Sequence, residues 1–473
     1  MGARTKIVAT LGPASREFET IRRLVEAGVD CFRINFSHGK YDEHQQALST
    51  IRSVEGELNR PVAVLADLCG PKIRVGAIAG GSVQLVEGSS LTIQRDPCEG
   101  TAERISTTLP EIVDAVRVGE TLLLDDGKLR LEVCQTHAPE YCVCKVIRGG
   151  PLSGGKGINL PQTALKVAAL TEKDRADAQW IAQRDFDYVA LSFVRSGQDI
   201  VQLRELLVAA GSGAQIVAKI EKPQALERLD EIIAAADALM VARGDLGVEM
   251  DLPAVPVAQK RIVSLCQGAG KPCIVATQML ESMISCATPT RAEVSDVANA
   301  VLDHADAVML SGETAVGKFP VETVDMMNRV VTAIEDWHDD SQCHCPVAVG
   351  APRTPAALAA AVRAILAVDD IAAVAIFTNT GTTARLFSKI RLGRPILAMS
   401  PELSVVRRMC LYYGVAAVRQ SDPPEHTRDV LTLAEKTVLE QGLARSGQKI
   451  IVISGRPIAQ AGKTNTLVVH TVE

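Results

Sequence analysis

The sequence predicts an α/β fold, a (β/α)8 TIM barrel with an inserted small β-barrel lid domain and a C-terminal α/β domain. Three observations predict it. Eight short apolar runs alternate with helical patterns in the first two thirds of the chain. One interval between two runs is far too long for a single helix, and a polar stretch precedes a last alternating segment. At 473 residues the chain also exceeds the roughly 250 to 300 residues that one hydrophobic core serves, so several domains are expected.

Each of the eight runs reads as a buried strand because it is short, β-branched or apolar, and bounded by polar or turn residues. Strands that alternate with helices form parallel sheets, and eight such units favour a closed barrel over an open sheet. Between runs, Thr171 before Glu172 and Asp174 predicts a capped helix that reaches Gln183. The runs are Ile7–Thr10, Cys31–Asn35, Val62–Asp67, Tyr188–Ser192, Ile216–Lys219, Ala238–Ala242, Cys273–Thr277 and Ala307–Leu310.

The long interval between Asp67 and Tyr188 contains its own strand patterns, separated by Gly, Pro and Asp turn signals. We read it as a small β-barrel that serves as a lid, with strands at Ser82–Leu85, Ser90–Ile93, Thr121–Leu124 and Tyr141–Val146. The expected domains are a barrel at 1–69 and 167–340, a lid at 70–166 and a C-terminal domain at 341–473.

Composition excludes several classes of protein. The chain has 50 Lys and Arg against 56 Asp and Glu, a net charge of -6, and no long basic block, which argues against a nucleic-acid partner. Charges interrupt the most apolar window, Pro355–Phe377, so we expect a helix and a strand there and no membrane span. Twelve scattered cysteines and a start without signal-peptide features indicate a reduced, cytoplasmic protein. We interpret Cys343-His344-Cys345 as a surface linker rather than a metal clip.

Polar side chains collect where the predicted strands end, which is where barrel enzymes place their catalytic groups. We therefore expect one convergent site at this end of the barrel. Its candidate residues are Arg33, Asn35, Ser37, His38, Asp67, Lys219, Glu221, Arg243, Asp245, Thr277, Ser311 and Glu313.

Lys219 and Glu221 lie two residues apart on a predicted strand, so both side chains leave the same face. Glu221 and Asp245 provide carboxylates on neighbouring strands, a donor set that suits Mg2+ when substrate oxygens and water complete its shell. A lysine beside such an ion can stabilise charge on phosphoryl or enolate oxygens. The pattern indicates phosphoryl transfer with a divalent ion, and a structural ion pair at the barrel rim is the alternative.

Two glycine-rich stretches were weighed as phosphate sites. The stretch 150–157 nearly matches a nucleotide-binding phosphate loop, but Gly157 stands where Ser or Thr is required, so we reject that interpretation. The stretch 376–384 passes from a strand to small hydroxyl residues and then to a helical pattern, and such a helix start can bind phosphate. An ordinary capped turn explains the second stretch equally well.

Several of these segments, in this order along the chain, resemble the pyruvate kinase family, of bacterial type. They are Thr5–Pro13, Arg33–Gly39, Gly70–Arg74, Ala218–Glu221, Met240–Glu249, Ala276–Glu281 and Met309–Gly317. The resemblance covers nearly the whole chain. It implies transfer of the phosphoryl group of phosphoenolpyruvate to ADP, giving pyruvate and ATP, in a cleft between barrel and lid.

The resemblance also implies residue roles. Lys219 stabilises transition-state and enolate charge, Arg33 holds the transferring phosphoryl group, and the Gly244 amide contacts the substrate carboxylate beside Asp245. Thr277 lies near the methylene carbon that is protonated, and Ser311 belongs to a proton relay. Glu221 and Asp245 hold Mg2+, with Mn2+ as an alternative ion, and the implied nucleotide contacts are Arg74, Asn35, His38 and Lys156.

One departure from the family pattern concerns potassium. Many members bind K+ through positions equivalent to Asn35, Ser37 and Asp67 together with a threonine, but this chain has Leu68 at the fourth position. Potassium-dependent members also tend to carry glutamate where this chain has Lys72, whose ammonium group can replace and repel the cation. We expect K+-independent activity.

The C-terminal segment resembles the family's regulatory domain. The loop that contains Thr378, Thr380, Gly381, Thr382 and Thr383 stands in the place of a phosphate-binding loop, which implies a phosphosugar or AMP effector. Family members are commonly homotetramers. Two rival functions remain open: a Mg2+-dependent carbon–carbon lyase, which needs neither the lid nor Arg33 and Arg74, and a non-catalytic metabolite sensor.

Overall fold

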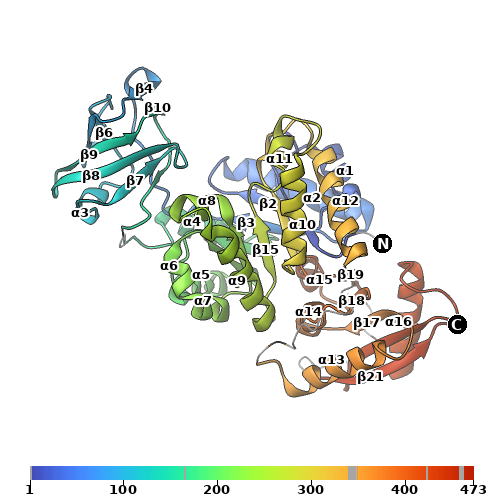
Figure 1. Cartoon of the computed structure of the whole chain (residues 1–473). Coiled ribbons are helices and arrows are strands. Elements are labelled where there is room, and N and C mark those ends of the chain that lie inside the picture. Colours follow the sequence, from blue (N-terminus) through green and yellow to red (C-terminus); the bar gives the residue numbers. More distant parts are fainter. Residues whose placement is uncertain are drawn as a thin grey trace.

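The computed structural model describes residues 3–163, 167–338, 348, 350–421, 424, 426–457 and 463–473. It divides into a lid, a barrel and a C-terminal sheet domain, and the barrel lies between the other two (Figure 1). The stretch Cys343-His344-Cys345 lies outside the described residues. Among the described helices, none is long and apolar enough to cross a membrane. All cysteines in the described part of the chain are free thiols.

Eight parallel strands form a closed barrel, which confirms the predicted fold class. The ring closes because the first strand pairs with both the second and the last. In seven of the eight strands, the side chains at the centre of the strand are buried, as expected for a sheet covered by helices. The strands are β1 (Lys6–Thr10), β2 (Cys31–Asn35), β3 (Ala63–Asp67), β12 (Tyr188–Leu191), β13 (Gln215–Ile220), β14 (Ala238–Ala242), β15 (Cys273–Ala276) and β16 (Ala307–Leu310).

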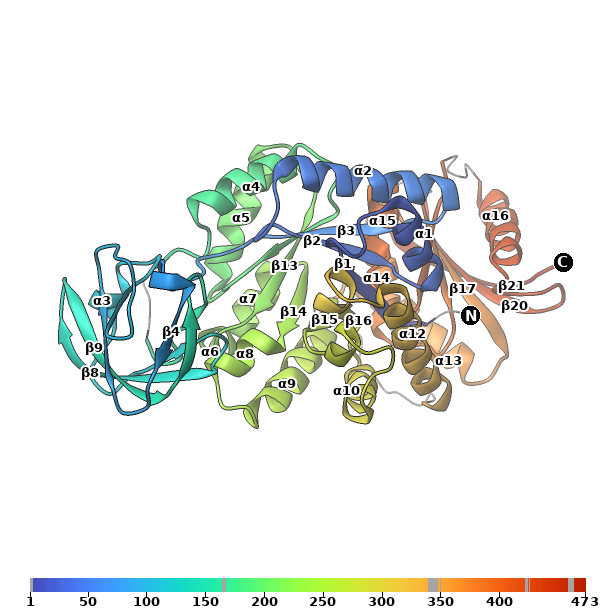
Figure 2. The same cartoon turned by 90° about the horizontal axis from the view of Figure 1, so that it is seen from above.

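Helices surround this ring on the outside (Figure 2). The predicted cap at Thr171 is present: its hydroxyl accepts a hydrogen bond from Asp174 N at 3.1 Å, and the Asp174 carboxylate accepts one from Thr171 N at 3.0 Å. The longer helices are α1 (Phe18–Ala27), α2 (Tyr41–Leu58), α4 (Glu172–Ala182), α5 (Gly197–Ala209), α9 (Ala254–Ala269), α10 (Arg291–Leu302) and α12 (Pro320–Trp337), with the shorter α6 (Pro223–Glu227), α7 (Leu229–Ala235), α8 (Arg243–Glu249) and α11 (Gly312–Ala315) between them.

The inserted lid is built from strands, as predicted, around an apolar core of its own. Six strands form one sheet, β11 (Ile158–Asn159), β7 (Thr121–Leu124), β8 (Leu129–His137), β9 (Tyr141–Arg148), β5 (Ser90–Gln94) and β6 (Arg104–Ser106), and β10 (Gly150–Ser153) pairs separately with β4 (Ser82–Leu85). Because the stretch from Gly150 onward is a strand followed by a turn, the rejected phosphate loop is absent there. The lid also contacts α8, since Asn159 Nδ2 donates to Glu249 Oε1 at 2.7 Å.

The C-terminal domain is an α/β sheet, which confirms its predicted class. Its strand order is β19 (Val415–Arg419), β18 (Ile396–Ser400), β17 (Ile371–Phe377), β20 (Lys449–Gly455) and β21 (Thr464–Thr471), and the last strand alone runs antiparallel to its neighbour. The helices are α13 (Arg353–Leu366), α14 (Thr382–Lys389), α15 (Leu403–Met409) and α16 (Thr427–Glu440). The apolar window that the sequence analysis singled out therefore covers most of a helix and a strand, as expected.

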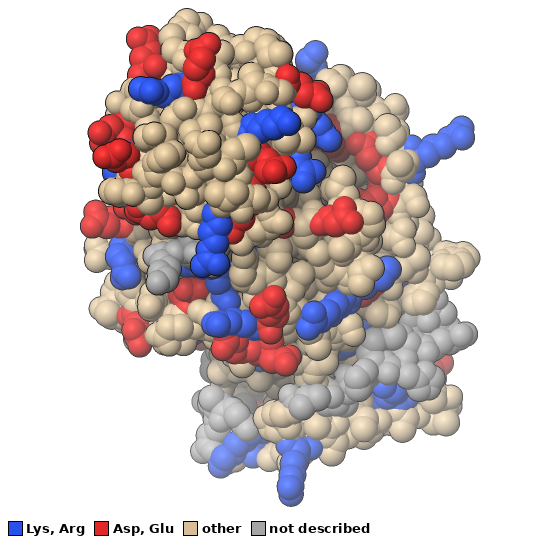
Figure 3. Space-filling model, turned by 60° about the vertical axis from the view of Figure 1, so that its left-hand side comes forward, with Lys and Arg blue, Asp and Glu red and all other residues tan. Residues whose placement is uncertain are grey.

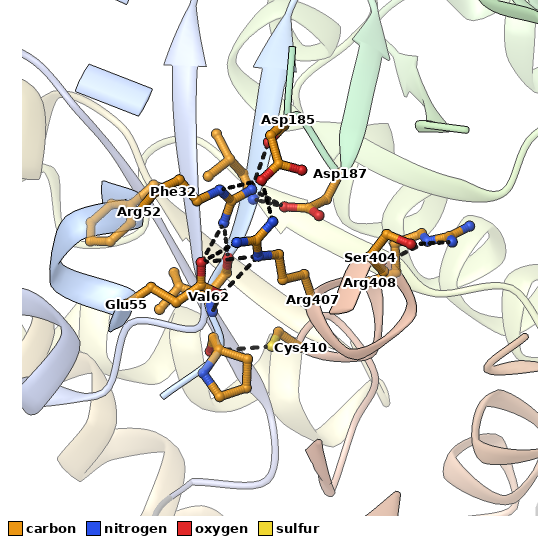
Figure 4. A network of polar contacts seen from close by, with 12 residues as sticks. Phe32, Arg52, Glu55, Val62, Asp185, Asp187, Ser404, Arg407, Arg408 and Cys410 are labelled. Atoms are coloured by element: carbon orange, nitrogen blue, oxygen red, sulfur yellow. Dashed lines mark hydrogen bonds and ion pairs between the residues drawn. The ribbon is translucent and has the colours of Figure 1, made fainter. Parts of the chain in front are cut away.

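This domain docks against the N-terminal ends of the barrel strands. Arg407 on α15 pairs with Glu55 on α2 at 2.6 Å and with Asp185, and Arg52 of the same barrel helix pairs with Asp187 at 2.7 Å (Figure 4). The lid lies toward the opposite end of the barrel, at the C-terminal ends of the strands (Figure 1). On the lid-side face in Figure 3, basic and acidic side chains are interspersed rather than gathered into a basic patch.

Candidate active site

The ammonium group of Lys219 has three close polar partners at the strand ends. Its Nζ lies 2.7 Å from Glu221 Oε1 and 3.2 Å from Asp67 Oδ1, and it donates a hydrogen bond to Ser192 Oγ at 2.7 Å. Burial opposes the charged form, but the two carboxylates outweigh it and raise the pKa of Lys219 above its usual value. The lysine is therefore cationic and held in one orientation before substrate binds.

Arg33 on β2 reaches the same buried carboxylate from the other side. Its Nε and Nη2 each lie 2.7 Å from Asp67 Oδ2, and Nη1 donates to Thr10 Oγ1 at 3.1 Å. Burial alone would raise the pKa of Asp67, but Lys219 and Arg33 lower it below its usual value. Asp67 is thus ionised and fixes two cations side by side at the mouth of the barrel.

Glu221 lies close enough to Asp245 for their carboxylate charges to interact. It is almost fully buried, and its Oε2 accepts a hydrogen bond from Phe193 N at 2.8 Å. Burial raises the pKa of Glu221 above its usual value; Lys219 opposes this rise and Asp245 adds to it. A divalent cation would relieve the repulsion between these two carboxylates.

The carboxylates of Glu221 and Asp245 suit a Mg2+ ion that is bound partly by water and substrate, rather than a metal site built only from protein ligands. Among the described residues, no group of three or more His, Cys, Asp or Glu side chains is placed to hold a metal. Mg2+ usually takes one or two carboxylates and keeps several positions for water and substrate oxygens. Glu221 and Asp245 supply that number.

Thr277 and Ser311 follow β15 and β16. Thr277 Oγ1 accepts a hydrogen bond from Gly244 N at 2.7 Å and donates one to Ala276 O at 2.6 Å. Ser311 N donates to the buried carboxylate of Glu313 at 2.7 Å, while the Ser311 hydroxyl is buried and has no hydrogen-bond partner among the described residues. Thr277 thus meets the amide at the start of α8, and the Ser311 hydroxyl is unengaged.

Lid and barrel together enclose a cleft of about 350 Å³ next to this cluster. Three cationic side chains of the inserted segment line it, Lys72, Arg74 and Lys156, and Asp245 lines it from the barrel side. Arg74 Nη1 donates to Gly155 O at 2.9 Å. The lid also contributes Asp125, which pairs with Lys156 at 2.8 Å, and Asp126, so cationic and acidic side chains of the lid face Asp245 across the cleft.

Four residues that the resemblance assigns to K+ already have protein partners. Asn35 Oδ1 accepts from Ser37 N at 3.0 Å, and Asp67 lies between Arg33 and Lys219. The Leu68 side chain is buried, and its carbonyl accepts a hydrogen bond from Ser192 Oγ at 2.7 Å.

His38 is exposed beside this group. Its pKa is lowered below the usual value, first by partial burial and then by the nearby charges of Lys72, Arg74 and Arg33. The structure therefore brings this histidine to the cationic side of the cleft.

Sequence analysis missed three contributors to the site: Thr10, Ser192 and Phe193. The first two carried a usable signal, because each is a polar residue at the end of a buried strand. Phe193 acts through its backbone N–H, which no side-chain pattern reveals.

A second cavity, of about 360 Å³, lies in the C-terminal domain beside the predicted effector loop. Thr378, Thr380, Thr382 and Thr383 line it, whereas Gly381 donates its N–H to Thr378 Oγ1 at 3.0 Å and is not among the lining residues. Two cationic residues, Arg385 and Lys463, also line the cavity. The loop thus borders a hollow with hydroxyl and positive groups.

Comparison with known proteins gives concordant matches over almost the whole chain. The family model described as "Pyruvate kinase, barrel domain" matches residues 2–324, and "Pyruvate kinase, alpha/beta domain" matches residues 356–470. Pyruvate kinase 2 of Synechocystis sp. is 44% identical over 99% of this chain and 79% of its own length. Pyruvate kinase of Mycobacterium tuberculosis is 41% identical over 100% of this chain and 99% of its own. A crystal structure of a pyruvate kinase from Cryptosporidium parvum superposes with a TM-score of 0.94 at 34% identity, covering 100% of this chain and 96% of the other.

Proposed function

The chain belongs to the pyruvate kinase family, and from this premise we propose how its residues transfer the phosphoryl group of phosphoenolpyruvate to ADP, giving pyruvate and ATP. One observation carries the proposal: the Lys219 ammonium group is buried and fixed by Glu221 and Asp67 at the mouth of the barrel. A fixed cation in a largely dry cleft stabilises developing negative charge without reorganising during the reaction. Lys219 thus stabilises the transferring phosphoryl group and the enolate oxygen that it leaves.

Arg33 is the second cation of the reaction. Its guanidinium group is held by Asp67, and its forked N–H donors match the oxygens of a phosphoryl group. The Gly244 amide, one of the first N–H groups of α8, donates to Thr277 Oγ1 in this structure and would also bind the substrate carboxylate. Arg33 and Gly244 therefore orient the two anionic ends of phosphoenolpyruvate.

Glu221 and Asp245 would hold Mg2+. When bound, the ion would neutralise charge on substrate oxygens and favour phosphoryl transfer. The raised pKa of Glu221, caused by burial and by Asp245, supports this role, because a cation is the missing compensation for two neighbouring carboxylates. Mn2+, which accepts the same oxygen ligands, is an alternative ion.

Protonation of the enolate carbon completes the reaction. Thr277 Oγ1 lies at the end of β15 beside the substrate-orienting amide, so we assign it to the methylene side of the substrate. The Ser311 hydroxyl, which has no hydrogen-bond partner among the described residues, lies just after the neighbouring strand β16 and extends this polar path. Together they would pass a proton from solvent to the methylene carbon.

The nucleotide occupies the cleft between lid and barrel. Arg74 and Lys156 line that cleft. Asn35 ends β2, and His38 lies on the loop after it, near the charges of Lys72 and Arg74. Positive charge from the lid complements the phosphates of ADP, so lid closure and nucleotide binding would favour each other.

Potassium is not required in this proposal. Leu68 offers no side-chain oxygen, and its carbonyl is occupied by Ser192 Oγ. Lys72, which lines the cleft, supplies positive charge that K+ would otherwise bring.

Our proposals for regulation, assembly and location rest mainly on the family to which the chain belongs. The cavity beside Thr378 to Thr383 would take a phosphosugar or AMP, because hydroxyls, a helix start and two cationic side chains suit a phosphate group. We also propose a cytoplasmic homotetramer.

The direct test of the reaction is pyruvate release from phosphoenolpyruvate by the wild-type protein. Release should require both ADP and Mg2+, and ATP should form in equal amount, because each transferred phosphoryl group yields one molecule of each product. A protein that stays silent with K+ and phosphosugars added would contradict the proposal and would favour a lyase or a metabolite sensor.

A further inference from the structure

Arg243 is the first residue of α8, directly before Gly244 and Asp245. It does not line the cleft between lid and barrel. Its guanidinium group instead reaches back to the segment after β15, where Nη2 donates to Thr277 O at 2.8 Å and to Gln278 O at 3.3 Å. Arg243 therefore links the backbone of two loops that both face the reacting end of the substrate.

The Thr277–Gln278 segment, to which Arg243 donates hydrogen bonds, has an unusual backbone conformation. Thr277 and Gln278 have positive φ angles of 70° and 55°, so two consecutive residues with side chains adopt the left-handed conformation. That conformation is uncommon for residues other than glycine, and especially for a β-branched residue such as threonine. It persists only where the surroundings impose it.

Arg243 donates to the carbonyl groups of Thr277 and Gln278. The guanidinium group therefore binds the turn at the two residues that adopt the left-handed conformation. The arginine is itself anchored, because Nη1 lies 2.7 Å from the Asp296 carboxylate on α10. The turn then sets the position of Thr277 Oγ1, which accepts from Gly244 N at 2.7 Å.

We propose that Arg243 is a positioning residue that holds the Thr277–Gln278 turn in its left-handed conformation and so places the Thr277 hydroxyl for proton transfer to the methylene carbon. The proposal rests on the function proposed above. It assigns a role to a side chain that touches neither substrate nor nucleotide, with Asp296 as its anchor.

The variant Arg243→Lys tests the role. Lysine keeps the positive charge, but a single ammonium group cannot span both carbonyls and the carboxylate as the planar fork does. Two rates are compared: pyruvate release, and exchange of the methyl hydrogens of pyruvate with solvent deuterium, followed by NMR. Misplacing a catalytic group can lower a reaction rate by about 100-fold. In Arg243→Lys, the rate of exchange should therefore fall by about that factor, and by clearly more than the rate of pyruvate release.

Arg204→Lys is the matched control. Arg204 makes the same kind of contacts far from the site, since Nη2 donates to Ala235 O at 2.8 Å and to Asp237 Oδ2 at 3.0 Å before β14 begins. Its two rates should match those of the wild type. Asp296→Asn, which weakens the anchor without altering α8, should reproduce the preferential loss of exchange if Arg243→Lys fails to fold.

Two results would overturn the positioning role: equal loss of both rates in a folded variant, or no loss of exchange in either variant. A wild-type protein that releases no pyruvate would instead contradict the proposed function. The two failures are therefore distinguishable.

Discussion

Glu221 and Asp245, the proposed Mg2+ ligands, lead to a prediction about metal dependence. Glu221→Gln should raise the Mg2+ concentration needed for half-maximal pyruvate release by about 10-fold or more, since a hydrogen bond or contact to a charged group contributes about 1.5 to 3 kcal/mol. Titrating Mg2+ at saturating substrate measures this. Asp251→Asn, an exposed acid just beyond α8, is the control and should leave the titration unchanged. An unchanged Mg2+ requirement in Glu221→Gln would exclude this carboxylate as a ligand.

Leu68 and Lys72 lead to a prediction about monovalent cations. Activity in tetramethylammonium salts with Mg2+ should equal activity in K+, because the chain supplies its own positive charge at the cleft. The Lys72→Glu variant should be less active in tetramethylammonium salts, and adding K+ should restore its activity. Lys40→Glu, the same change at an exposed site, should leave activity unchanged in both salts. Near-complete loss of wild-type activity without K+, with recovery on its addition, would show that Leu68 does not prevent K+ binding.

At the scale of elements, α14 connects the effector loop to the base of the barrel. Its last residue, Lys389, lies 2.6 Å from Asp306, which directly precedes β16, and the two side chains are 2% and 1% exposed. Removing one partner of a buried pair leaves an uncompensated charge. The pair therefore joins α14, which follows the predicted effector loop, to the strand that precedes Ser311.

Lys389→Met should lower the free energy of unfolding by about 3 to 5 kcal/mol, the usual cost of breaking a buried pair. Urea denaturation measures this, and Lys389→Met combined with Asp306→Asn should recover part of the loss because the buried charge is gone. Lys449→Met, which breaks an exposed pair with Asp369, should cost under about 1 kcal/mol. Equal losses in the buried and exposed cases would mean that the buried pair does not stabilise the interface.

The effector loop gives a prediction about regulation. Phosphosugars or AMP should shift the phosphoenolpyruvate saturation curve to lower concentrations, because they would bind the loop at the start of α14. Thr382→Val removes one lining hydroxyl and should weaken this shift without changing the curve measured alone. A curve that no phosphosugar or AMP moves would indicate a vestigial cavity.

Elements of regular pattern could be predicted from the sequence, and strained connections could not. The eight barrel strands, the capped helix after Thr171 and the strand-rich insertion follow from periodicity, capping and turn residues. The Thr277–Gln278 turn has no such signal, because threonine does not favour a positive φ and the hydrogen bonds to the turn come from Arg243 at the start of α8, which is distant in sequence. Likewise, the Lys389–Asp306 pair joins residues 83 apart in sequence.

At the scale of the whole molecule, the two ends of the barrel are used differently. The C-terminal domain covers the N-terminal ends of the strands, while the lid faces their other ends (Figure 1). Lys219, Glu221 and Thr277 lie at those other ends of β13 and β15. The cavity of the C-terminal domain and the candidate active site therefore lie at opposite ends of one barrel. Any coupling between them has to pass through the barrel or through contacts between subunits.

The central claim is that this chain is a phosphotransferase whose chemistry depends on the charge of Lys219. The most direct measurement is pyruvate release from phosphoenolpyruvate and ADP with Mg2+, for wild type, Lys219→Met and the exposed control Lys449→Met. Wild type and control should turn over equally, and Lys219→Met should lose at least about 100-fold in kcat because a fixed electrostatic contact to the transition state is gone. Turnover of Lys219→Met close to that of the wild type would contradict the account.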